Sequence, residues 1–219
     1  MILEEKINEL KEKILIMADI AKGMVFKSIR TLTEKNEALA NEVIENDEPK
    51  VNNLEIEIEE NAINLIALHQ PEASHLRTVM MIIKINNDLE RIGDHAVNIA
   101  QGVMEWLIHK PMVKPLIDLP RMAEGATRML ADSVDAFIRG DAELARDVCR
   151  RDSEIDSLLD QITRELITYM MSDPKTIDRA LALILVARNL ERIADLATNL
   201  AEDVIYMVKG EIIKHHRGA

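Results

Sequence analysis

The sequence contains few of the residues that build sheets, turns and cross-links. Aromatic residues make up 2% of the 219 residues, and there are 7 Gly, 6 Pro and a single cysteine, Cys149. Few aromatic residues argue against β-sheet, whereas abundant Leu, Ile, Ala, Met and Glu favour helices. One cysteine excludes an internal disulfide, and we expect Cys149 to pack as a small apolar residue. The composition therefore predicts an all-α protein.

Long apolar runs and an excess of positive charge are also lacking. The longest uninterrupted apolar run, ALALILVA from Ala180, has eight residues, far fewer than the ~20 that span a bilayer. The first residues, MILEEKINEL, carry acids where a signal peptide has its basic region. A formal net charge of −12 repels nucleic-acid phosphates and attracts cations. We expect a cytoplasmic protein with no nucleic-acid partner.

Breaks in the helical periodicity divide the chain into two halves. The segment KPMVKPLIDLP from Lys110 has three prolines in eleven residues and is typical of a linker. Pro49 interrupts the second helical segment and could open a new helix there, because a first turn tolerates proline. We expect helices at about 3–35, 37–69, 72–109, 118–139, 141–172 and 174–209. The predicted organisation is a first bundle at 1–110, a linker at 111–120, a second bundle at 121–210 and a tail at 211–219.

The two halves repeat each other. NDLERIGDHAVNIA from Asn87 is matched by RNLERIADLATNLA from Arg188, at a constant offset (188 − 87 = 101). MADIAKGMVFKS from Met17 is matched by MAEGATRMLADS from Met122 (122 − 17 = 105). Three amphipathic helices can bury their apolar stripes together. The repeat therefore predicts a tandem duplication of an antiparallel, up-down-up three-helix bundle, with the two copies related by a pseudo-twofold axis.

Acids recur at fixed places within the repeated motif. At about 100° per residue, the acidic and amide positions of each copy fall within a sector of roughly 80° at the edge of the apolar stripe. Carboxylates one turn apart repel each other by a few tenths of a kcal/mol, and a bound cation relieves that cost. A solvated acidic stripe is the alternative. The candidate metal ligands are Glu90, Asp94, Glu191 and Asp195, with Asn98 and Asn199 beside them.

Histidine contributes little to these candidate sites. Glu72-x-x-His75 has a spacing seen in di-iron helices, but it occurs once, at a helix start. His95 adjoins Asp94, yet its counterpart is Leu196, and we expect a surface histidine there. The pattern predicts metal sites built from oxygen ligands, for which iron, zinc, magnesium, manganese and calcium are all candidates.

The chain resembles the PhoU family of phosphate-signalling proteins in two segments, QPEASHLRTVMMIIKINNDLERIGD from Gln70 and NLERIADLATNLAEDV from Asn189. The resemblance covers essentially the whole chain. It implies a tandem three-helix architecture and metal ions, single or in multinuclear clusters, at Glu/Asp-x-x-x-Asp motifs. Here those motifs are Glu90 with Asp94, and Glu191 with Asp195.

The resemblance also implies a non-enzymatic regulatory adaptor in inorganic phosphate uptake. Such a protein would restrain the phosphate-starvation response by linking the ATPase subunit of a phosphate ABC transporter to a sensor histidine kinase. We expect it to form a homodimer or a higher homo-oligomer, and to meet membranes only through its partner proteins. Two other readings remain open: a carboxylate-metal hydrolase acting on phosphate esters, and a metal-free structural adaptor whose acids are solvated.

The two candidate sites differ in their surroundings. Aligning Val51 with Ile155 (155 − 51 = 104) pairs Glu48 and Asn52 with Asp152 and Asp156. The second half thus offers two further carboxylates, and the first offers one acid and one amide. If Glu48, Asp152 and Asp156 complete the sites, the second half binds metal more tightly.

Overall fold

The computed structural model describes residues 2–210; Met1 and the expected tail at 211–219 lie outside the described residues. Every regular element in the described part of the chain is helical. The all-α prediction is confirmed, as is the tandem repeat of three long helices. The elements are α1 (Ile2–Glu34), α2 (Glu37–Asn41), the π-helix η1 (Glu42–Asp47), α3 (Glu48–His69), α4 (Ala73–Trp106), α5 (Asp118–Arg139), α6 (Ala142–Ser172), the 3₁₀ turn η2 (Pro174–Thr176) and α7 (Ile177–Lys209).

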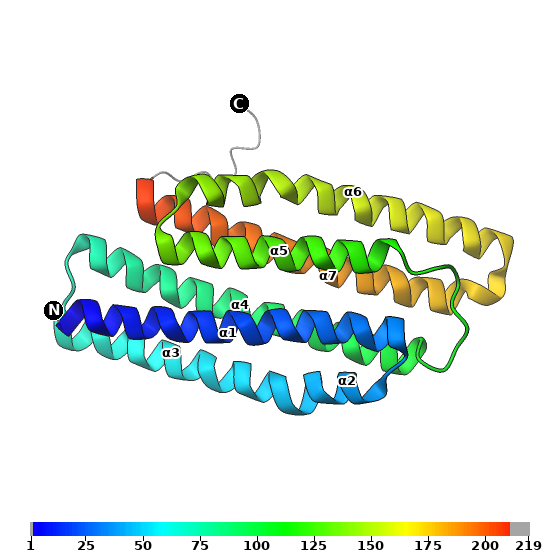
Figure 1. Ribbon diagram of the computed structural model, residues 1–219, viewed down its shortest axis with the longest axis horizontal. Helices are drawn as coiled ribbons and strands as arrows, with labels where there is room; N and C mark the ends of the chain where they lie inside the picture. The colour runs from blue at the N-terminus through cyan, green and yellow to red at the C-terminus, as the bar shows by residue number, and fades with distance from the viewer. Residues whose placement is uncertain (1, 211–219) are drawn as a thin grey trace.

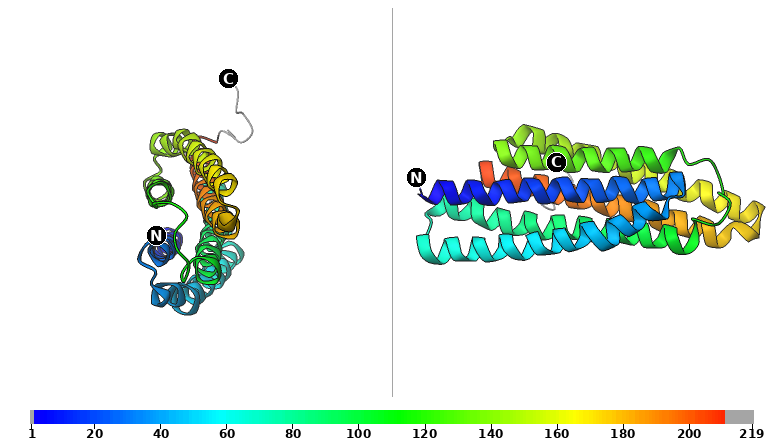
Figure 2. Two further views of the ribbon diagram at one scale, coloured as in Figure 1. Left: turned by 90° about the vertical axis from the view of Figure 1, so that its right-hand side faces the viewer. Right: turned by 60° about the horizontal axis from the view of Figure 1, so that its bottom comes forward.

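The helices run alternately in opposite directions and form an elongated molecule (Figures 1 and 2). Helices α1, α3 and α4 make the first half, and α5, α6 and α7 make the second. The halves lie side by side along their length, with α4 antiparallel to α7 and α1 antiparallel to α5, and both pairs are in contact. α3 and α6 lie on the outer sides (Figure 2). This arrangement agrees with a pseudo-twofold axis between the copies.

The two motif helices lie at the centre of the molecule. Buried residues number 16 of 33 in α7 but only 7 of 31 in α6, because α7 packs against both its own bundle and α4. The apolar stripe of α4 is fully buried. Its members are Leu89, Ile92, Ala96, Ile99 and Val103, each with 0% of its surface exposed.

Equivalent turns start the second helical segment of each half. Gly140 has a φ of 66°, and Asp141 then caps α6 by accepting hydrogen bonds from the amides of Glu143 and Leu144, both at 3.0 Å. In the first half, Lys35 has a φ of 52° and Asn36 caps α2 by accepting from the amide of Ala38 at 3.1 Å. Both turns combine a residue in the left-handed conformation with a side-chain cap. The two capping residues are 105 positions apart (141 − 36 = 105), which is the offset between the first helices of the two halves.

The expectation of one helix from 37 to 69 is only partly correct. The chain stays helical, but η1 interrupts the α-helical pattern between α2 and α3. From Asn36 to Glu48 there are 12 steps along the chain (48 − 36 = 12), whereas from Asp141 to Asp152 there are 11 (152 − 141 = 11). A π-bulge lets a helix absorb one extra residue without changing its direction. The bulge thus explains why the offset between the halves falls from 105 to 104.

The connection between the halves begins earlier than its prolines suggest. α4 ends at Trp106 rather than near 109, because the amides of Leu107 and Ile108 both bond to the carbonyl of Val103, at 3.0 and 2.9 Å, and close the last turn. Further along, Arg179 at the start of α7 donates to the carbonyl of Pro111 at 2.8 Å. α7 itself begins at Ile177, after the 3₁₀ turn η2, rather than at 174.

The two phenylalanines provide a test of the packing. Phe137 of α5 is fully buried, whereas Phe26 of α1 is 61% exposed. We expect Phe137→Ala to lower the free energy of unfolding by about 3–5 kcal/mol. Phe26→Ala, the matched control, should change it by at most about 0.5 kcal/mol. Urea unfolding followed by circular dichroism measures both, and equal losses would contradict the packing described above.

Candidate metal sites

The repeated acids lie at the edges of the central helices. Glu90 and Asp94 stand one turn apart on α4, and Glu191 and Asp195 stand one turn apart on α7. Glu90, Glu191 and Asp195 are half-buried, and Asp94 is exposed. Since the apolar residues of the same helices fill the core, each acidic pair is left at the margin between core and solvent.

In the first half, the charges of three other carboxylates on α3 and α4 act on Glu90. Burial raises the pKa of the Glu90 carboxyl above its ordinary value, and the charges of Asp94 and Glu55 raise it further. Arg91 lowers this pKa, and Glu48 adds a smaller rise. Acids from α3 therefore face the acids of α4 and are close enough to act on Glu90.

The second half has the same arrangement. Burial again raises the pKa of Glu191, and the charge of Asp195 raises it further, while Arg192 lowers it. Smaller rises come from Asp156 and Asp152 on α6. The guanidinium of Arg192 lies 3.1 Å from Asp195 Oδ2 and 3.6 Å from Glu191 Oε2. Two helices thus supply two acids each to this edge.

Hydrogen bonds between helices hold the facing acids in place. The side chain of Asn86 on α4 donates from Nδ2 to the carbonyl of Glu55 at 2.8 Å. In the second half, Thr198 Oγ1 on α7 donates to Asp152 Oδ1 at 3.2 Å, and both residues are buried. The equivalent of Thr198 in the first half is the buried Val97 (198 − 97 = 101), so the two halves fix their facing helices by different contacts.

The candidate ligands identified from the sequence do not all gather at these two edges. Glu48, Asp152 and Asp156 act on the motif glutamates as described above. Asn199 of the second half lines a groove of about 460 Å³ between the halves, together with Asp88 of α4 and Glu55 of α3. Asn98 is exposed on α4.

Sequence reasoning missed Glu55. The spacing of Glu48, Asn52 and Glu55 along α3, four residues and then three, places them on one face of that helix. That spacing could have identified Glu55. The repeat does not mark this position, because the counterpart of Glu55 is Leu159 (159 − 55 = 104).

The chemistry of these residues fits a hard cation, although their side chains do not surround one. Within residues 2–210, no three His, Cys, Asp or Glu side chains lie close enough together to hold one metal ion. The donors at each edge are carboxylate oxygens, which suit magnesium, manganese, calcium or iron. Their mutual repulsion is of the kind that a bound cation removes. Metal binding would therefore require these side chains to turn toward a shared centre.

Two other candidate residues have different environments from the metal edges. His95 is not a free surface histidine: it is half-buried, and its Nδ1 lies 2.9 Å from Oδ1 of Asn189 on α7, which links the two halves. Burial and the charges of Glu202 and Asp152 raise the pKa of the Cys149 thiol to about 11. Cys149 therefore remains a neutral thiol at neutral pH, as expected of a packed small residue.

Fold and site together define a duplicated helical-bundle protein that carries one acidic edge on each copy. Comparisons with known proteins give the family. The PhoU domain matches residues 3–103 and again residues 119–204, one match for each half. The chain belongs to the PhoU family.

Several relatives match nearly the whole chain. A phosphate-specific transport system accessory protein PhoU homolog of Aquifex aeolicus is 44% identical and covers 97% of this chain and 96% of its own. The phosphate-specific transport system accessory protein PhoU homolog 2 of Thermotoga maritima is 40% identical, and the match covers 97% of this chain and 90% of that protein. Among solved structures, PhoU from Pseudomonas aeruginosa superposes with a TM-score of 0.91 at 34% identity, over 95% and 99% of the two chains. The phosphate transport system regulatory protein PhoU from Streptococcus pneumoniae superposes with a TM-score of 0.87 at 28% identity, over 96% of this chain and 98% of that chain.

The raised pKa values lead to a prediction about pH. A carboxyl group whose pKa is higher in the folded protein than in the unfolded chain destabilises the fold at pH values above both pKa values. That cost is relieved as the pH falls through the folded pKa toward the ordinary value of 4.5. In metal-free protein, Glu90→Gln with Glu191→Gln should therefore stabilise the fold at pH 7, by a few tenths of a kcal/mol per site. The gain should shrink as the pH falls through the folded pKa and vanish only below the ordinary value of 4.5.

Glu143 provides the control for this measurement. Its exposed carboxylate accepts a hydrogen bond from Lys209 at 2.9 Å, which lowers its pKa. Glu143→Gln should therefore lower stability at pH 7, and the loss should shrink as the pH falls through the folded pKa. Thermal melting from about pH 3 to 7 in the presence of a chelator compares the variants. A stabilisation by Glu90→Gln and Glu191→Gln that does not depend on pH would show that their charge is not the cause.

Proposed function

We propose that this protein is a metal-binding regulatory adaptor that restrains inorganic phosphate uptake and the phosphate-starvation response. It links the ATPase subunit of a phosphate ABC transporter to a sensor histidine kinase and catalyses no reaction itself. The names of its relatives, accessory and regulatory proteins of phosphate-specific transport, support the transport setting. No helix among residues 2–210 is long and apolar enough to cross a membrane, so contact with a membrane transporter would be made through its protein surfaces.

The observation that carries the metal proposal is the meeting of acids from two helices at equivalent places in both halves. Glu90 and Asp94 would hold metal with Glu48 and Glu55, and Glu191 and Asp195 would hold it with Asp152 and Asp156. A bound divalent or trivalent cation supplies positive charge where these residues otherwise repel one another. We infer that the metal cross-links α3 to α4 and α6 to α7, and so stiffens the faces that partner proteins contact.

Removing one acid from each edge should lower metal content without unfolding the protein. We expect the double variant Asp94→Ala, Asp195→Ala, purified without added metal, to lose most of its bound metal by elemental analysis. Its helical circular dichroism should be unchanged, because Asp94 is exposed and Asp195 is half-buried. The double variant Asp19→Ala, Asp160→Ala, which removes two exposed acids elsewhere, should keep its metal. Full metal content in the first variant would exclude these sites.

The same variants test the regulatory proposal separately. Each is expressed with the transporter ATPase and the kinase in cells grown at high and low phosphate. We expect the unaltered protein to co-purify with both partners and to repress uptake at high phosphate, and the metal-site variant to lose repression. Failure of the unaltered protein to bind either partner would contradict the adaptor role, whatever its metal content.

Glu55 should contribute to the first site. We expect Glu55→Gln to weaken metal binding by the first half, because Glu55 acts on Glu90. Glu59→Gln is the matched control, since Glu59 lies one turn further along α3 and is exposed. Titration with manganese in a background of Asp195→Ala, which removes an acid of the second site, measures the first site alone. Equal affinities for the two variants would remove Glu55 from the ligand set.

A further inference from the structure

Three exposed apolar residues of the first half have counterparts in the second half that are also exposed and apolar. The corresponding pairs are Ile63 and Ile167 (167 − 63 = 104), Leu76 and Ile177 (177 − 76 = 101), and Met80 and Leu181 (181 − 80 = 101). Between 37% and 54% of each residue is exposed. The offsets are those that relate α3 to α6 and α4 to α7 elsewhere in the repeat.

This recurrence distinguishes the three pairs from other exposed apolar residues. Single exposed apolar side chains are normal on protein surfaces. The exposed Phe26 corresponds to Ala131 (131 − 26 = 105), and the exposed Ile16 corresponds to Arg121 (121 − 16 = 105). Among the large exposed apolar residues within 2–210, the three pairs are those that both halves keep.

In the first half, Ile63, Leu76 and Met80 form the first patch, beside the turn between α3 and α4. A hydrogen bond from Asn86 to the carbonyl of Glu55 fixes how these antiparallel helices face each other. Ile63 lies eight residues from Glu55 toward the turn (63 − 55 = 8), and position 78 lies eight residues from Asn86 toward it (86 − 78 = 8). Ile63 therefore faces the part of α4 between Leu76 and Met80.

In the second half, the equivalent residues Ile167, Ile177 and Leu181 form the second patch, beside the turn between α6 and α7. Half-buried apolar residues next to each patch pack against the core: Ile66 and Ile83 in the first half, and Met170 and Ile184 in the second. Each patch is thus the exposed end of the apolar packing between two helices.

Both patches lie on the same face of the molecule. The helices α3, α4, α7 and α6 pack side by side in that order, and α1 and α5 cover one side of this layer (Figure 2). Since α4 is in contact with α1, α3 and α7, its exposed residues point away from α1, and exposed residues of α7 point away from α5 for the same reason. The pseudo-twofold axis therefore relates the two patches across one face.

Contacts between α4 and α7 set the distance between the patches. His95 of α4 lies beside Asn189 of α7. Because the helices are antiparallel, Leu181 (189 − 181 = 8) lies near the level of position 103 on α4 (103 − 95 = 8). Met80 is 23 residues from that position (103 − 80 = 23), which is about 35 Å at 1.5 Å per residue.

The face is acidic where it adjoins the first patch. The groove between the halves is lined by four acids and one cation: Glu55, Glu59, Asp88, Asp203 and Lys84. Ile63 lies one turn beyond Glu59 on α3, so the groove runs on into the patch. Of these acids, only Glu55 belongs to the proposed metal sites. An anionic lipid surface or an equally acidic second copy is repelled here, whereas a surface that carries Lys or Arg is attracted.

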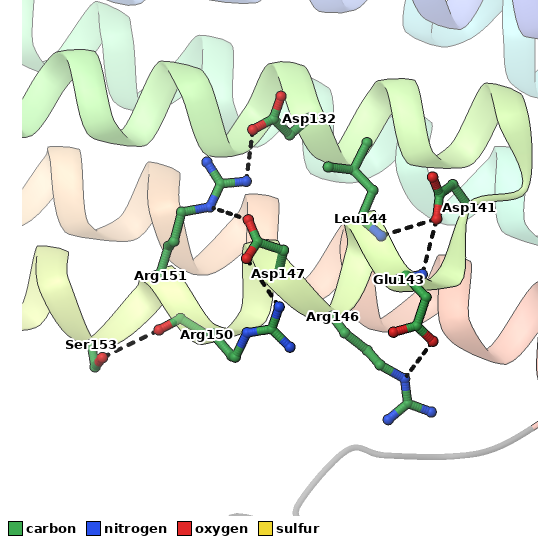
Figure 3. A network of polar contacts seen from close by, with 9 residues as sticks. All are labelled: Asp132, Asp141, Glu143, Leu144, Arg146, Asp147, Arg150, Arg151 and Ser153. Atoms are coloured by element: carbon green, nitrogen blue, oxygen red, sulfur yellow. Dashed lines mark hydrogen bonds and ion pairs between the residues drawn. The ribbon is translucent and has the colours of Figure 1, made fainter.

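The α5–α6 side of the molecule has a different surface. Arg151 Nη2 lies 2.6 Å from Asp132 Oδ2, and Arg150 Nη2 lies 3.0 Å from Asp147 Oδ1, within a network of ion pairs (Figure 3). Charged residues there pair with one another, whereas the two patches leave apolar surface in contact with water. Covering the patches therefore gains hydrophobic free energy.

We propose that this face docks one partner protein that has twofold symmetry. Each of two identical partner subunits places an apolar anchor on one patch, and Lys or Arg residues of the partner lie against the acidic groove. One copy of this chain then serves two partner subunits. The two contacts reinforce each other, because the second forms within a complex that is already bound. The inference rests on the proposed adaptor function and specifies its docking face.

Glutamate in each patch tests the docking face. Met80→Glu and Leu181→Glu replace exposed side chains, and Phe26→Glu, which replaces an exposed side chain of α1, is the matched control. The probes are the purified transporter ATPase and sensor kinase of the proposed function, and isothermal titration calorimetry measures binding. We expect each patch variant to weaken the binding of a probe by about 100-fold or more, because one contact remains. Phe26→Glu should leave binding unchanged, and all three variants should keep their metal content and helical circular dichroism.

The composition of the complex tests the symmetry. Native mass spectrometry should show one copy of this chain for every two partner subunits. Undiminished binding by Met80→Glu with Leu181→Glu, or a ratio of one to one, would overturn the docking face and leave the adaptor function standing. Failure of the unaltered protein to bind either probe would overturn both.

The same variants test the other possible occupants of the face. If the double variant dissociates a dimer of this chain, the patches serve a second copy. If the unaltered protein binds phosphatidylglycerol vesicles and the double variant does not, they serve a lipid surface. Either result, with binding of the probes unchanged, would contradict the proposal.

Discussion

The antiparallel contact between α4 and α7 is the constraint on which the rest of the molecule depends. Both helices carry the repeated motif, and each must bury residues toward its own bundle and toward the other half. That double demand explains why nearly half of α7 is buried. It also leaves each motif helix a narrow margin facing its neighbour, α3 or α6, and the acids lie on that margin. Packing thus decides where charged residues can remain.

Acids at the margin of a core are costly unless something neutralises them. The raised pKa values of Glu90 and Glu191 express that cost, and both arise first from burial and then from neighbouring carboxylates. The two edges have the same plan but differ in detail. Asp152 is buried and receives a hydrogen bond from Thr198, whereas the first half has Glu55 and a π-bulge beside Glu48. With Glu55, the first half has four acids at its edge, as many as the second half. The number of acids therefore no longer supports tighter metal binding by the second half.

Much of the fold could be predicted from the sequence, because helical periodicity and a constant offset are local signals. The turn at Gly140 and Asp141, for example, has residues that favour a left-handed conformation and a cap. A feature that depends on contacts between the halves was not predictable, since His95 bonds to a residue 94 positions away. The π-bulge lies within the first half, and in the sequence it shows only as a shift of one residue in the offset between the halves. In the candidate sites, the repeat identifies the acids that occur in both halves. It does not identify Glu55, because the counterpart of Glu55 is a leucine.

The central claim is that both acidic edges hold metal. Anomalous diffraction from crystals of the untagged protein, purified without chelator or added metal and measured at the absorption edge of the metal found by elemental analysis, tests it most directly. The account predicts one anomalous peak, or one cluster of peaks, between α3 and α4 beside Glu90, and an equivalent one between α6 and α7 beside Glu191. Peaks confined to other surfaces, or protein that contains no metal at all, would contradict it.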